Sequence, residues 1–359
     1  MKVVISGGGT VGHVNPAVAL GRALSEDEVT FIGTSRGVEA RIVPAARFPF
    51  ETIEVQGFDR AKPASLVRVG VTALKATGRA RRLLRTLSPD AVVGMGGYVA
   101  LPVCFAARSL RIPVVVHEQN IVLGLTNRLC KRFARRVAVS FEETLAEAGR
   151  RGVDTGNPVL PEIAEMDVDV ERKKAIDRFD LDPDRRTLLV FGGSQGAQRI
   201  NGLVPHLVEL WRDKRDRQIV HISGSAQPAA EPGGESELIY RTTSYVESMS
   251  EMYAVADIAL CRGGATTIAE LTAVGVPGVI VPYPYHRDRQ QELHGRALER
   301  VGAATVLMER DATALAVDEI AGPLLDDVKR LDGMRAAAKS FGRPEAARQL
   351  AAVVREVAA

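Results

Sequence analysis

The residue types between positions 257 and 291 suit the binding of a nucleotide. The segment DIALCRGGATTIAELTAVGVPGVIVPYPYHRDRQQ begins with a short apolar strand, breaks at Gly263 and Gly264, and continues as a helix from about Ala265 and Thr266. The start of a helix offers unpaired N–H groups and a positive dipole end to an anion. Glu270 follows about one turn later, where its carboxylate can accept hydrogen bonds from both hydroxyls of a ribose. This spacing predicts a site for a nucleoside diphosphate rather than for a bare phosphate.

Other polar residues of the second half extend this predicted site. Gln290 and Gln291 are neighbouring amides, which can hydrogen-bond sugar hydroxyls through both donors and acceptors without a charge. Contacts to a nucleoside, a diphosphate and a sugar together indicate a nucleotide-sugar ligand. The candidates in this half are Ser194 in the turn GGSQGA, Arg262, Ala265, Thr266, Thr267, Glu270, Gln290 and Gln291.

The first half carries a second group of candidates, each just after a predicted strand. They belong to the segments GGGTVGH, GMGGY and HEQN. The carboxyl ends of parallel strands meet at one edge of a sheet, so these segments are expected to converge. We therefore expect His13, Tyr98, His117 and Glu118 to share a site, although His117 or Glu118 taken singly suits a hydrogen-bonded structural role.

The first glycine turn matches a dinucleotide-binding fingerprint incompletely. GGGTVG lacks the G-x-G-x-x-G spacing, and the second strand ends in Thr34-Ser35-Arg36 without an acidic residue at the usual distance. An NAD site is therefore weakly supported, and a plain tight turn between a strand and a helix is an equal alternative.

Strands and helices alternate through both halves, which predicts an α/β protein with parallel sheets. A break with two prolines, Asn157 to Pro161, separates the halves. The predicted fold is two doubly wound, Rossmann-like domains facing each other across a cleft, at residues 1–160 and 161–342. Asp167 and Asp169 spell D-x-D in the charged segment after the break, where a solvated loop is expected rather than a metal site. Buried strands are expected at Val3–Ile5, Ile258–Leu260 and Gly278–Val281. Further strands are expected at Thr30–Gly33, Thr52–Val55, Ala91–Val93, Val114–Val116, Val137–Val139, Thr187–Phe191, Ile219–Ile222 and Ile239–Thr242, and the rest of the chain after the last strand is expected to be mainly helical.

Composition restricts the class of protein. The 359 residues are 46% hydrophobic and 25% charged, which is ordinary for a soluble globular protein with two cores. Three widely spaced cysteines argue against a disulfide framework or a zinc site, and for a reducing compartment. The start MKVVISGGG predicts a first strand rather than a signal peptide, and no apolar run approaches the ~20 residues of a membrane span.

Charge is divided unevenly between the halves. Residues 1–160 hold 22 Lys and Arg against 13 Asp and Glu, a net charge of +9, so the remainder carries −6 of the overall +3. A basic half predicts an anionic partner, either nucleic acid or a membrane surface. A helix predicted at 66–87 suits either a solvated basic face or a helix lying on an anionic membrane. Its apolar and basic residues are Leu66, Val67, Val69, Val71, Leu74 and Arg68, Lys75, Arg79, Arg81, Arg82, Arg85, and Arg132, Arg135 and Arg136 could extend the patch.

The order of the motifs resembles that of one known family. GGGTVGHVNPAVAL, GMGGYV, HEQN, GNPV, GGSQGA, CRGGATTIAE and HRDRQQ follow one another as in the MurG family of peptidoglycan glycosyltransferases, over nearly the whole chain. The resemblance implies the GT-B fold, with the last helix, 343–359, crossing back onto the first domain. It also implies metal-independent, inverting transfer of N-acetylglucosamine from UDP-N-acetylglucosamine (UDP-GlcNAc) to the MurNAc 4-hydroxyl of lipid I, the undecaprenyl-diphosphate-linked MurNAc-pentapeptide, giving lipid II. A peripheral protein at the cytoplasmic face of the inner membrane is expected, with no cofactor and no nucleic acid.

The resemblance further implies a role for individual residues. The Thr10, Val11 and Gly12 backbone and Asn120 would lie beside the donor sugar and diphosphate, and Ser194 on the nucleotide side. Val246 would contact uracil through its main chain, Ala265 to Glu270 would hold diphosphate and ribose, and Gln290 and Gln291 the sugar hydroxyls. His13, Tyr98, His117 and Glu118 would face the acceptor. Two positions depart from the family pattern: Val11 replaces a frequent Gly, and Leu160 replaces a frequent Arg thought to touch the donor, for which Arg262 is a possible substitute.

Inversion requires one in-line displacement at the anomeric carbon, with a base that takes the proton of the acceptor hydroxyl. His13 is the first candidate because an imidazole titrates near neutral pH. His13 could instead donate a hydrogen bond to a phosphate, and Glu118 is the alternative base. Three other functions remain compatible: a diacylglycerol glycosyltransferase, a UDP-GlcNAc epimerase of the same fold, and a non-catalytic membrane scaffold.

Overall fold

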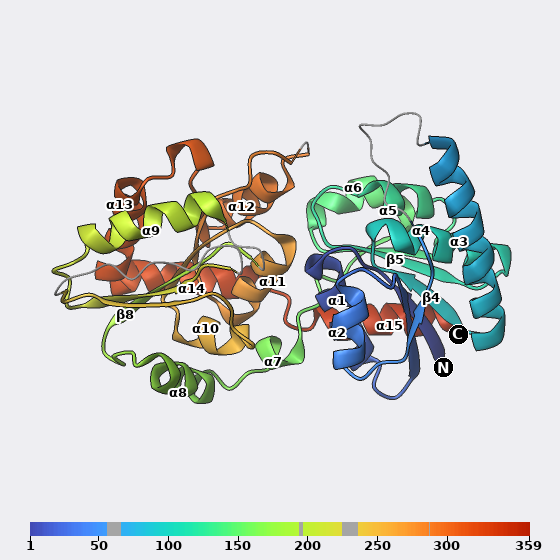
Figure 1. Cartoon of the computed structure of the whole chain (residues 1–359), viewed down its shortest axis with the longest axis horizontal. Coiled ribbons are helices and arrows are strands. Elements are labelled where there is room, and N and C mark those ends of the chain that lie inside the picture. The colour runs from blue at the N-terminus through green and yellow to red at the C-terminus, as the bar shows by residue number, and fades with distance from the viewer. Residues whose placement is uncertain (56–65, 194–196, 225–235, 287) are drawn as a thin grey trace. The chain divides into compact units, whose positions relative to one another are not determined.

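The chain forms two compact units, each built around a parallel sheet (Figure 1). The computed structural model describes residues 1–55, 66–193, 197–224, 236–286 and 288–359, and for 66–71 it describes the backbone alone. Met1–Pro161 and Arg343–Ala359 make up the first unit, and Glu162–Gly342 the second. Ser194 lies outside the described residues.

The first unit has a seven-stranded sheet in the order β3-β2-β1-β4-β5-β6-β7, and every adjacent pair is parallel. Side chains alternate between the two faces, as they must in an extended chain. Val4 packs with α3, α4 and α5, whereas Val3 and Ile5 pack with α1, α2 and α15. The strands are β1 Lys2–Ser6, β2 Glu28–Gly33, β3 Phe50–Thr52, β4 Ala91–Gly94, β5 Val114–Glu118, β6 Arg136–Val139 and β7 Gly152–Asp154.

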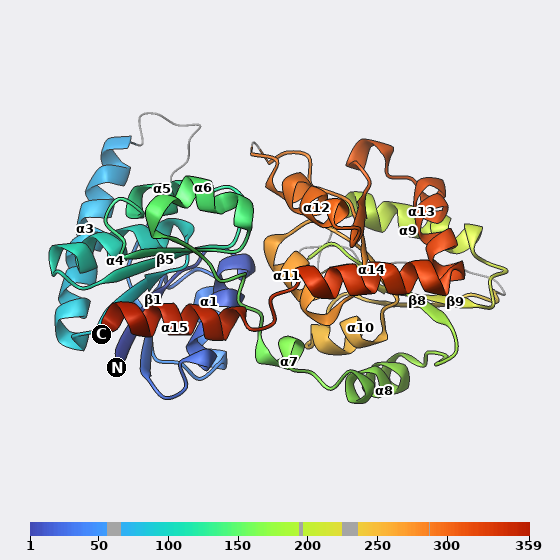
Figure 2. The ribbon, with the colours of Figure 1, turned by 180° about the vertical axis from the view of Figure 1, so that it is seen from behind.

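The helices of the first unit cover both faces of this sheet, so the unit is doubly wound. Figure 2 shows the last helix, α15, beside α1, although they are separated by most of the chain. Leu350, Ala351 and Val354 bury one side of α15 in the core of this unit. The helices are α1 Val11–Ala23, α2 Glu39–Ala45, α3 Leu66–Leu87, α4 Gly97–Ser109, α5 Leu125–Cys130, α6 Leu145–Ala148 and α15 Ala346–Ala358.

The second unit repeats the plan with six parallel strands in the order β10-β9-β8-β11-β12-β13. Helices α9 and α13 pack on one face, and α10 lies on the other (Figure 1). The strands are β8 Arg186–Phe191, β9 Arg217–Ile222, β10 Ile239–Thr243, β11 Ile258–Cys261, β12 Gly278–Ile280 and β13 Ala304–Val306. The helices are α7 Pro161–Ala164, α8 Val168–Phe179, α9 Gln198–Leu210, α10 Met249–Val255, α11 Ala265–Val274, α12 Gln290–Arg300, α13 Ala314–Asp326 and α14 Val328–Phe341.

Two details of the sequence-based expectations were wrong. The strand expected at Thr52–Val55 lies earlier in the chain, as β3, Phe50–Thr52. The mainly helical region after β12 also contains one short strand, β13. Asp167 does not lie in a loop: its carboxylate accepts hydrogen bonds from the backbone N–H groups of Asp169 and Val170 and caps α8. The D-x-D pair is therefore a helix start, where an acidic side chain satisfies orphan N–H groups.

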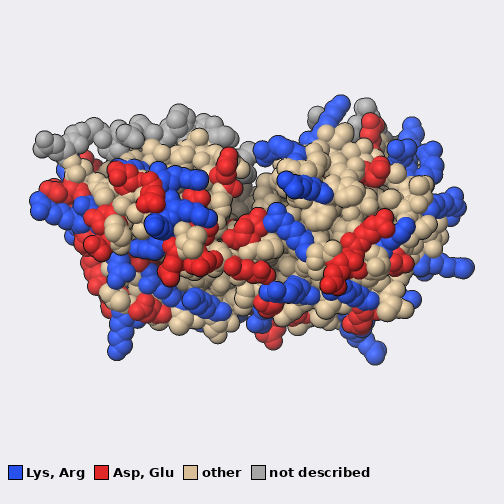
Figure 3. All heavy atoms as spheres, turned by 90° about the horizontal axis from the view of Figure 1, so that it is seen from below, with Lys and Arg blue, Asp and Glu red and all other residues tan. Residues whose placement is uncertain are grey.

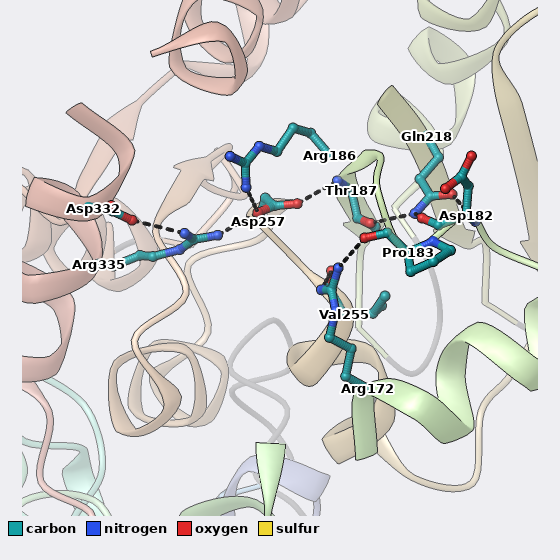
Figure 4. A network of polar contacts seen from close by, with 10 residues as sticks. All are labelled: Arg172, Asp182, Pro183, Arg186, Thr187, Gln218, Val255, Asp257, Asp332 and Arg335. Carbon is teal, nitrogen blue, oxygen red and sulfur yellow. Dashed lines mark hydrogen bonds and ion pairs between the residues drawn. The ribbon is translucent and has the colours of Figure 1, made fainter. Parts of the chain in front are cut away.

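Asp257, at the start of β11, ties three elements of the second unit together (Figure 4). Its buried carboxylate accepts hydrogen bonds from the backbone N–H of Thr187 at 2.7 Å and from Arg186 Nη1 at 3.2 Å, both in β8. Arg335 of α14 donates to the same carboxylate. Gln218 of β9 donates to Thr187 Oγ1. This network fixes β8 and β11 as neighbours at their amino ends.

In each unit the strand order reverses at one place. The chain runs outward through β1, β2 and β3 and returns to place β4 beside β1; β8, β9, β10 and β11 repeat this. Ligands of such sheets bind outside the carboxyl ends of the strands at the reversal. The loops after β1 and β4, and those after β8 and β11, are therefore the places where a ligand is expected.

Candidate functional site

The glycine turn after β11 lies against the start of α12. A Cβ at Gly263 would lie 2.3 Å from the carbonyl oxygen of Gln291, so a side chain at this position has no room. His294 of α12 hydrogen-bonds the Gly263 carbonyl through Nδ1 at 2.9 Å. The N-termini of α11 and α12 are thereby brought together, which places Ala265 to Thr267 near Gln290 and Gln291.

Helix α11 begins at Ala265 with Gly264 as its N-cap, and no side chain caps it. Ala265, Thr266 and Thr267 form its first turn, which carries no acidic residue. The backbone N–H groups of such a turn, with the helix dipole, suit an anion. The diphosphate position expected from the sequence is this turn, and it stays a prediction.

Glu270 projects from the second turn of α11 and is buried, with 8% of its surface exposed. Tyr253 of α10 donates a hydrogen bond from its hydroxyl to Glu270 Oε2 at 2.7 Å. Burial raises the pKa of Glu270 to about 7; Glu162 also raises it, while the Tyr253 hydroxyl opposes the shift. Tyr253 was not among the residues singled out from the sequence, because nothing local marks a core tyrosine as a partner of a carboxylate 17 residues away.

The two glutamines at the start of α12 are half-buried and differ in their contacts. Gln291 Oε1 accepts a hydrogen bond from the backbone N–H of Tyr283 at 2.9 Å, and Gln290 donates to Asp288. Val246 is half-buried in the segment between β10 and α10. All three are in the second unit with Glu270, as the sequence predicted.

Arg262 is held by its own unit. Its guanidinium donates to the carbonyl oxygens of Val281 and Pro282 at 3.1 and 3.2 Å, pairs with Glu309, and lies 5.6 Å from the ring centroid of Tyr283. These contacts brace the ends of β11 and β12. All three polar contacts use Nη1, so none of them engages Nη2 or Nε, and a donor contact by Arg262 in place of the family arginine stays a prediction. Leu160, at the position of that arginine, packs against the core of the first unit.

In the first unit the loops after β1 and β4 pack face to face. A Cβ at Gly97 would lie 2.4 Å from the carbonyl oxygen of Gly8, and Gly97 has a φ of +75°, so both space and conformation favour glycine here. Tyr98 is exposed and its ring lies over Gly9. Thr10 is exposed, and Val11 and Gly12 are half-buried at the start of α1.

His13 lies in the first turn of α1, with Nδ1 2.9 Å from the hydroxyl oxygen of Thr10. Its ring also lies beside Gly96: a Cβ atom added at that glycine would lie 3.2 Å from His13 Nε2. Burial lowers the pKa of His13 to about 4, against the attraction of Glu39. The ring is therefore neutral at pH 7, which a general base requires.

Glu118, at the end of β5, is turned toward its own loop. Its carboxylate accepts hydrogen bonds from the backbone N–H groups of Asn120 and Gly124 and from the side chains of Asn120 and Asn127, at 2.8 to 3.1 Å. Burial nevertheless raises its pKa. Four donors on one carboxylate organise the loop from 118 to 127, and they place Asn120 at its start.

His117 has both ring nitrogens engaged inside the unit. Nε2 lies 3.0 Å from the carbonyl oxygen of Gly156, which only accepts, so Nε2 carries the proton and Nδ1 accepts from Gln119 Nε2 at 3.0 Å. Gln119 Nε2 also donates to the carbonyl of Met95. Gln119 Oε1 is thereby turned toward Gly96. His117 thus positions Gln119, a residue not singled out from the sequence.

A third missed residue is Glu39, the first residue of α2. It is fully buried and accepts hydrogen bonds from the backbone N–H groups of Gly9 and Thr34, each at 3.0 Å, and from the Thr34 hydroxyl at 2.7 Å. Its carboxylate fixes the loop that carries Thr10 and precedes His13. Glu39 lies six residues after the end of β2. The dinucleotide fingerprint was compared only with Thr34 to Arg36, so this carboxylate was not singled out.

Helix α3 exposes both basic and apolar side chains. Lys75, Arg79, Arg82 and Arg85 are exposed, and Leu74 is 74% exposed. The apolar residues expected at 66–71 lie outside the described side chains. Figure 3 shows acidic and basic side chains intermingled over the face that it draws. Among the described helices, none has the length and apolar content needed to cross a bilayer.

Two family descriptions match the chain: the glycosyltransferase family 28 N-terminal domain over residues 3–139 and the C-terminal domain over 187–350. Enzymes named UDP-N-acetylglucosamine--N-acetylmuramyl-(pentapeptide) pyrophosphoryl-undecaprenol N-acetylglucosamine transferase, from Listeria welshimeri and Lactiplantibacillus plantarum, are each 39% identical over 99% of this chain and 99% of their own.

Solved structures agree with these matches. The crystal structure of Acinetobacter baumannii MurG superposes with a TM-score of 0.78 at 28% identity over 99% of both chains. A UDP-GlcNAc 2-epimerase from Neisseria meningitidis, at 15% identity over 99% of this chain and 100% of its own, reaches 0.69 and shares the fold alone. The predicted class of two parallel-sheet α/β domains is confirmed, and so is the resemblance carried by the motifs. The chain belongs to the MurG family of glycosyltransferases, within glycosyltransferase family 28.

Proposed function

We propose that this protein transfers N-acetylglucosamine from UDP-GlcNAc to lipid I and so forms lipid II. The observation that carries this proposal is the 39% identity, over 99% of both chains, to transferases named for that reaction. Two features support the proposal: a helix start suited to a diphosphate in the second unit, and the half-buried, neutral imidazole of His13 in the first. The similarity covers both domains, because it extends over 99% of this chain.

The second unit is the proposed donor-binding unit. The uncapped first turn of α11, Ala265 to Thr267, faces the diphosphate with its N–H groups, and Glu270 accepts the ribose hydroxyls. Gln290 and Gln291 hold the sugar hydroxyls, and Val246 meets the uracil through its main chain. Ser194, outside the described residues, remains a proposed nucleotide contact from the sequence.

The reaction is a single displacement with inversion. The acceptor oxygen attacks the anomeric carbon, the bond from that carbon to the UDP oxygen breaks, and the acceptor proton goes to a base. Negative charge then grows on the diphosphate of UDP. The dipole and backbone N–H groups of α11 stabilise that charge at the position where it develops.

His13 is the proposed base and Tyr98 a proposed acceptor contact. His13 is supported over Glu118 because Glu118 already accepts four hydrogen bonds from its own loop. Thr10 holds His13 Nδ1, so Nε2 is the nitrogen left to receive the proton. His117 and Glu118 then act through the residues they position, Gln119 and Asn120.

Peripheral binding to the cytoplasmic face of the inner membrane is proposed for the first unit. The exposed arginines of α3 meet anionic headgroups, and Leu74 enters the interface. Phe105 of α4, 43% exposed, and the exposed Arg132 and Arg135 extend this surface. Arg136 pairs with Glu356 and contributes less.

The test is to incubate the purified chain with radiolabelled UDP-GlcNAc and lipid I and to follow labelled lipid. Lipid II should form with UDP-GlcNAc and not with UDP-glucose or UDP-galactose. Transfer to diacylglycerol instead of lipid I would identify the other lipid glycosyltransferase. Release of UDP without any acceptor would identify the epimerase. Absence of every reaction, with UDP binding intact, would support the scaffold.

A further inference from the structure

Tyr253 and Glu270 form an isolated buried pair at the strand reversal of the second unit. Tyr253 comes from α10 and Glu270 from α11, and their side chains are 2% and 8% exposed. The Tyr253 hydroxyl donates to Glu270 Oε2 at 2.7 Å. Among the described residues no other group donates to this carboxylate, so Oε1 accepts no hydrogen bond from that part of the chain.

The tyrosine ring is fixed by its surroundings. It packs edge-on against Phe191, the last residue of β8, with centroids 6.1 Å apart and planes at 65°. All residues of α10 from Ser250 to Val255 are buried, so the helix cannot shift without opening the core. The hydroxyl therefore holds the carboxylate from a rigid base next to the carboxyl end of β8.

We propose that Tyr253 is a positioning residue of the donor site, which holds the Glu270 carboxylate in the ionised form and in the orientation that receives both hydroxyls of the ribose. This inference rests on the proposed donor site. A carboxylate bound at Oε2 by a buried donor keeps Oε1 and one lone pair of Oε2 for a ligand diol. Tyr253 itself need not touch the nucleotide.

The charge balance around Glu270 makes nucleotide binding sensitive to pH. Burial and Glu162 of α7 raise the pKa of Glu270 to about 7, whereas the Tyr253 hydroxyl lowers it. Burial, Glu270 and the Cys261 thiol of β11 all raise the pKa of the Tyr253 hydroxyl. From α12, His294 bonds the Gly263 carbonyl, and Lys339 of α14 lies beside Gly275 at the far end of α11.

The hydrogen-bonding needs of the ribose diol determine whether UDP affinity rises or falls with pH. Ionised Glu270 accepts from two hydroxyls, while the protonated acid presents a donor in place of one acceptor. UDP affinity should therefore rise as pH increases through about 7, the value to which burial brings Glu270. Loss of the tyrosine hydroxyl should move that rise to higher pH, because the ionised form loses its donor.

The experiment is calorimetric titration of the full chain with UDP and with 2′,3′-dideoxy-UDP at pH 6, 7 and 8. The dideoxy ligand carries the same phosphates, so its own titration cancels in the comparison. Tyr253→Phe should weaken UDP binding at pH 7 by about tenfold, as expected for one hydrogen bond to a charged group, and should leave dideoxy-UDP binding unchanged. Tyr240→Phe is the matched control, since its hydroxyl hydrogen-bonds His221 instead.

Each outcome decides one question. Equal UDP affinity in Tyr253→Phe and wild type would overturn the positioning role, and so would an equal loss for both ligands. If Tyr253→Phe does not fold, the wild type alone decides, because its preference for UDP over dideoxy-UDP must grow from pH 6 to pH 8. A preference that stays constant would overturn the inference. A wild type that binds neither ligand would instead refute the proposed donor site.

Discussion

Replacement of Glu39 by Gln should loosen the glycine loop of the first unit. Glu39 is fully buried and holds the backbone N–H of Gly9 and both donors of Thr34. Gln has nearly the same shape and keeps one oxygen, which can still serve Thr34. Its NH₂ group then faces the Gly9 N–H, so a donor meets a donor and the contact between α2 and the loop is lost.

The magnitude follows from the bonds involved. A hydrogen bond to a charged acceptor contributes ~1.5–3 kcal/mol. Gly9 is exposed, so water can replace part of the lost bond, and the expected cost is at the lower end, about 2 kcal/mol. If loop opening is local, that free energy corresponds to an increase of ~30-fold in the opening equilibrium.

Hydrogen exchange followed by mass spectrometry measures this directly. In Glu39→Gln, peptides that cover residues 7–14 should exchange about 30-fold faster at pH 7, while peptides from α9 in the second unit should not change. The turnover number of the transferase should fall, because this loop leads into His13, the proposed base. Thr34→Ser, which keeps the hydroxyl, is the matched control. Unchanged exchange in the loop would refute the reasoning.

The pH dependence of the same loop has a definite sign. Burial alone raises the pKa of Glu39, but hydrogen bonds from Thr34 and Gly9 lower it overall. A carboxyl group whose pKa is lower in the folded than in the unfolded protein stabilises the fold at every pH above its unfolded pKa. This stabilisation is lost as the pH falls through the folded pKa. Loop protection in the wild type should therefore decrease below about pH 4.5, near the ordinary carboxyl pKa, and Glu39→Gln should lack this decrease.

Three further outcomes are expected. Asp257→Ala should lower the free energy of unfolding of the second unit by ~3–5 kcal/mol, the usual cost of removing one partner of a buried charged network. Urea unfolding followed by the fluorescence of Trp211, the single tryptophan, measures this loss. A loss below ~1 kcal/mol would contradict the prediction. Changing Arg82 and Arg85 together to Glu should reduce sedimentation with anionic vesicles and leave UDP binding unchanged; equal sedimentation would return α3 to an ordinary solvated helix. His13→Gln should lower the turnover number by ~100-fold or more, and the wild-type rate with saturating substrates should show no titration near pH 6.5, because burial lowers the pKa of His13 to about 4.

The sequence by itself determined the local units of this protein. Alternation of apolar runs, glycine turns and helical segments is a property of neighbouring residues, so β1, β4, β5, β8 and β11 and the loops after them were all expected where they occur. The helix start at Ala265 and the position of Glu270 one turn later follow from helical spacing alone. The family motifs are local in the same way, and they predicted the fold class.

Tertiary structure decided which of these groups act together. Glu39 reaches Gly9 across 30 residues because β2 lies beside β1, and Tyr253 reaches Glu270 because α10 and α11 pack on one sheet. The ion pair between Arg262 and Glu309 likewise joins residues that are distant in the chain. The hydrogen bonds that Glu118 accepts depend on how its own loop closes. Side-chain partners are selected by packing, since a buried polar group must find a donor or acceptor wherever the fold provides one. A pattern of neighbouring residues carries no record of that choice.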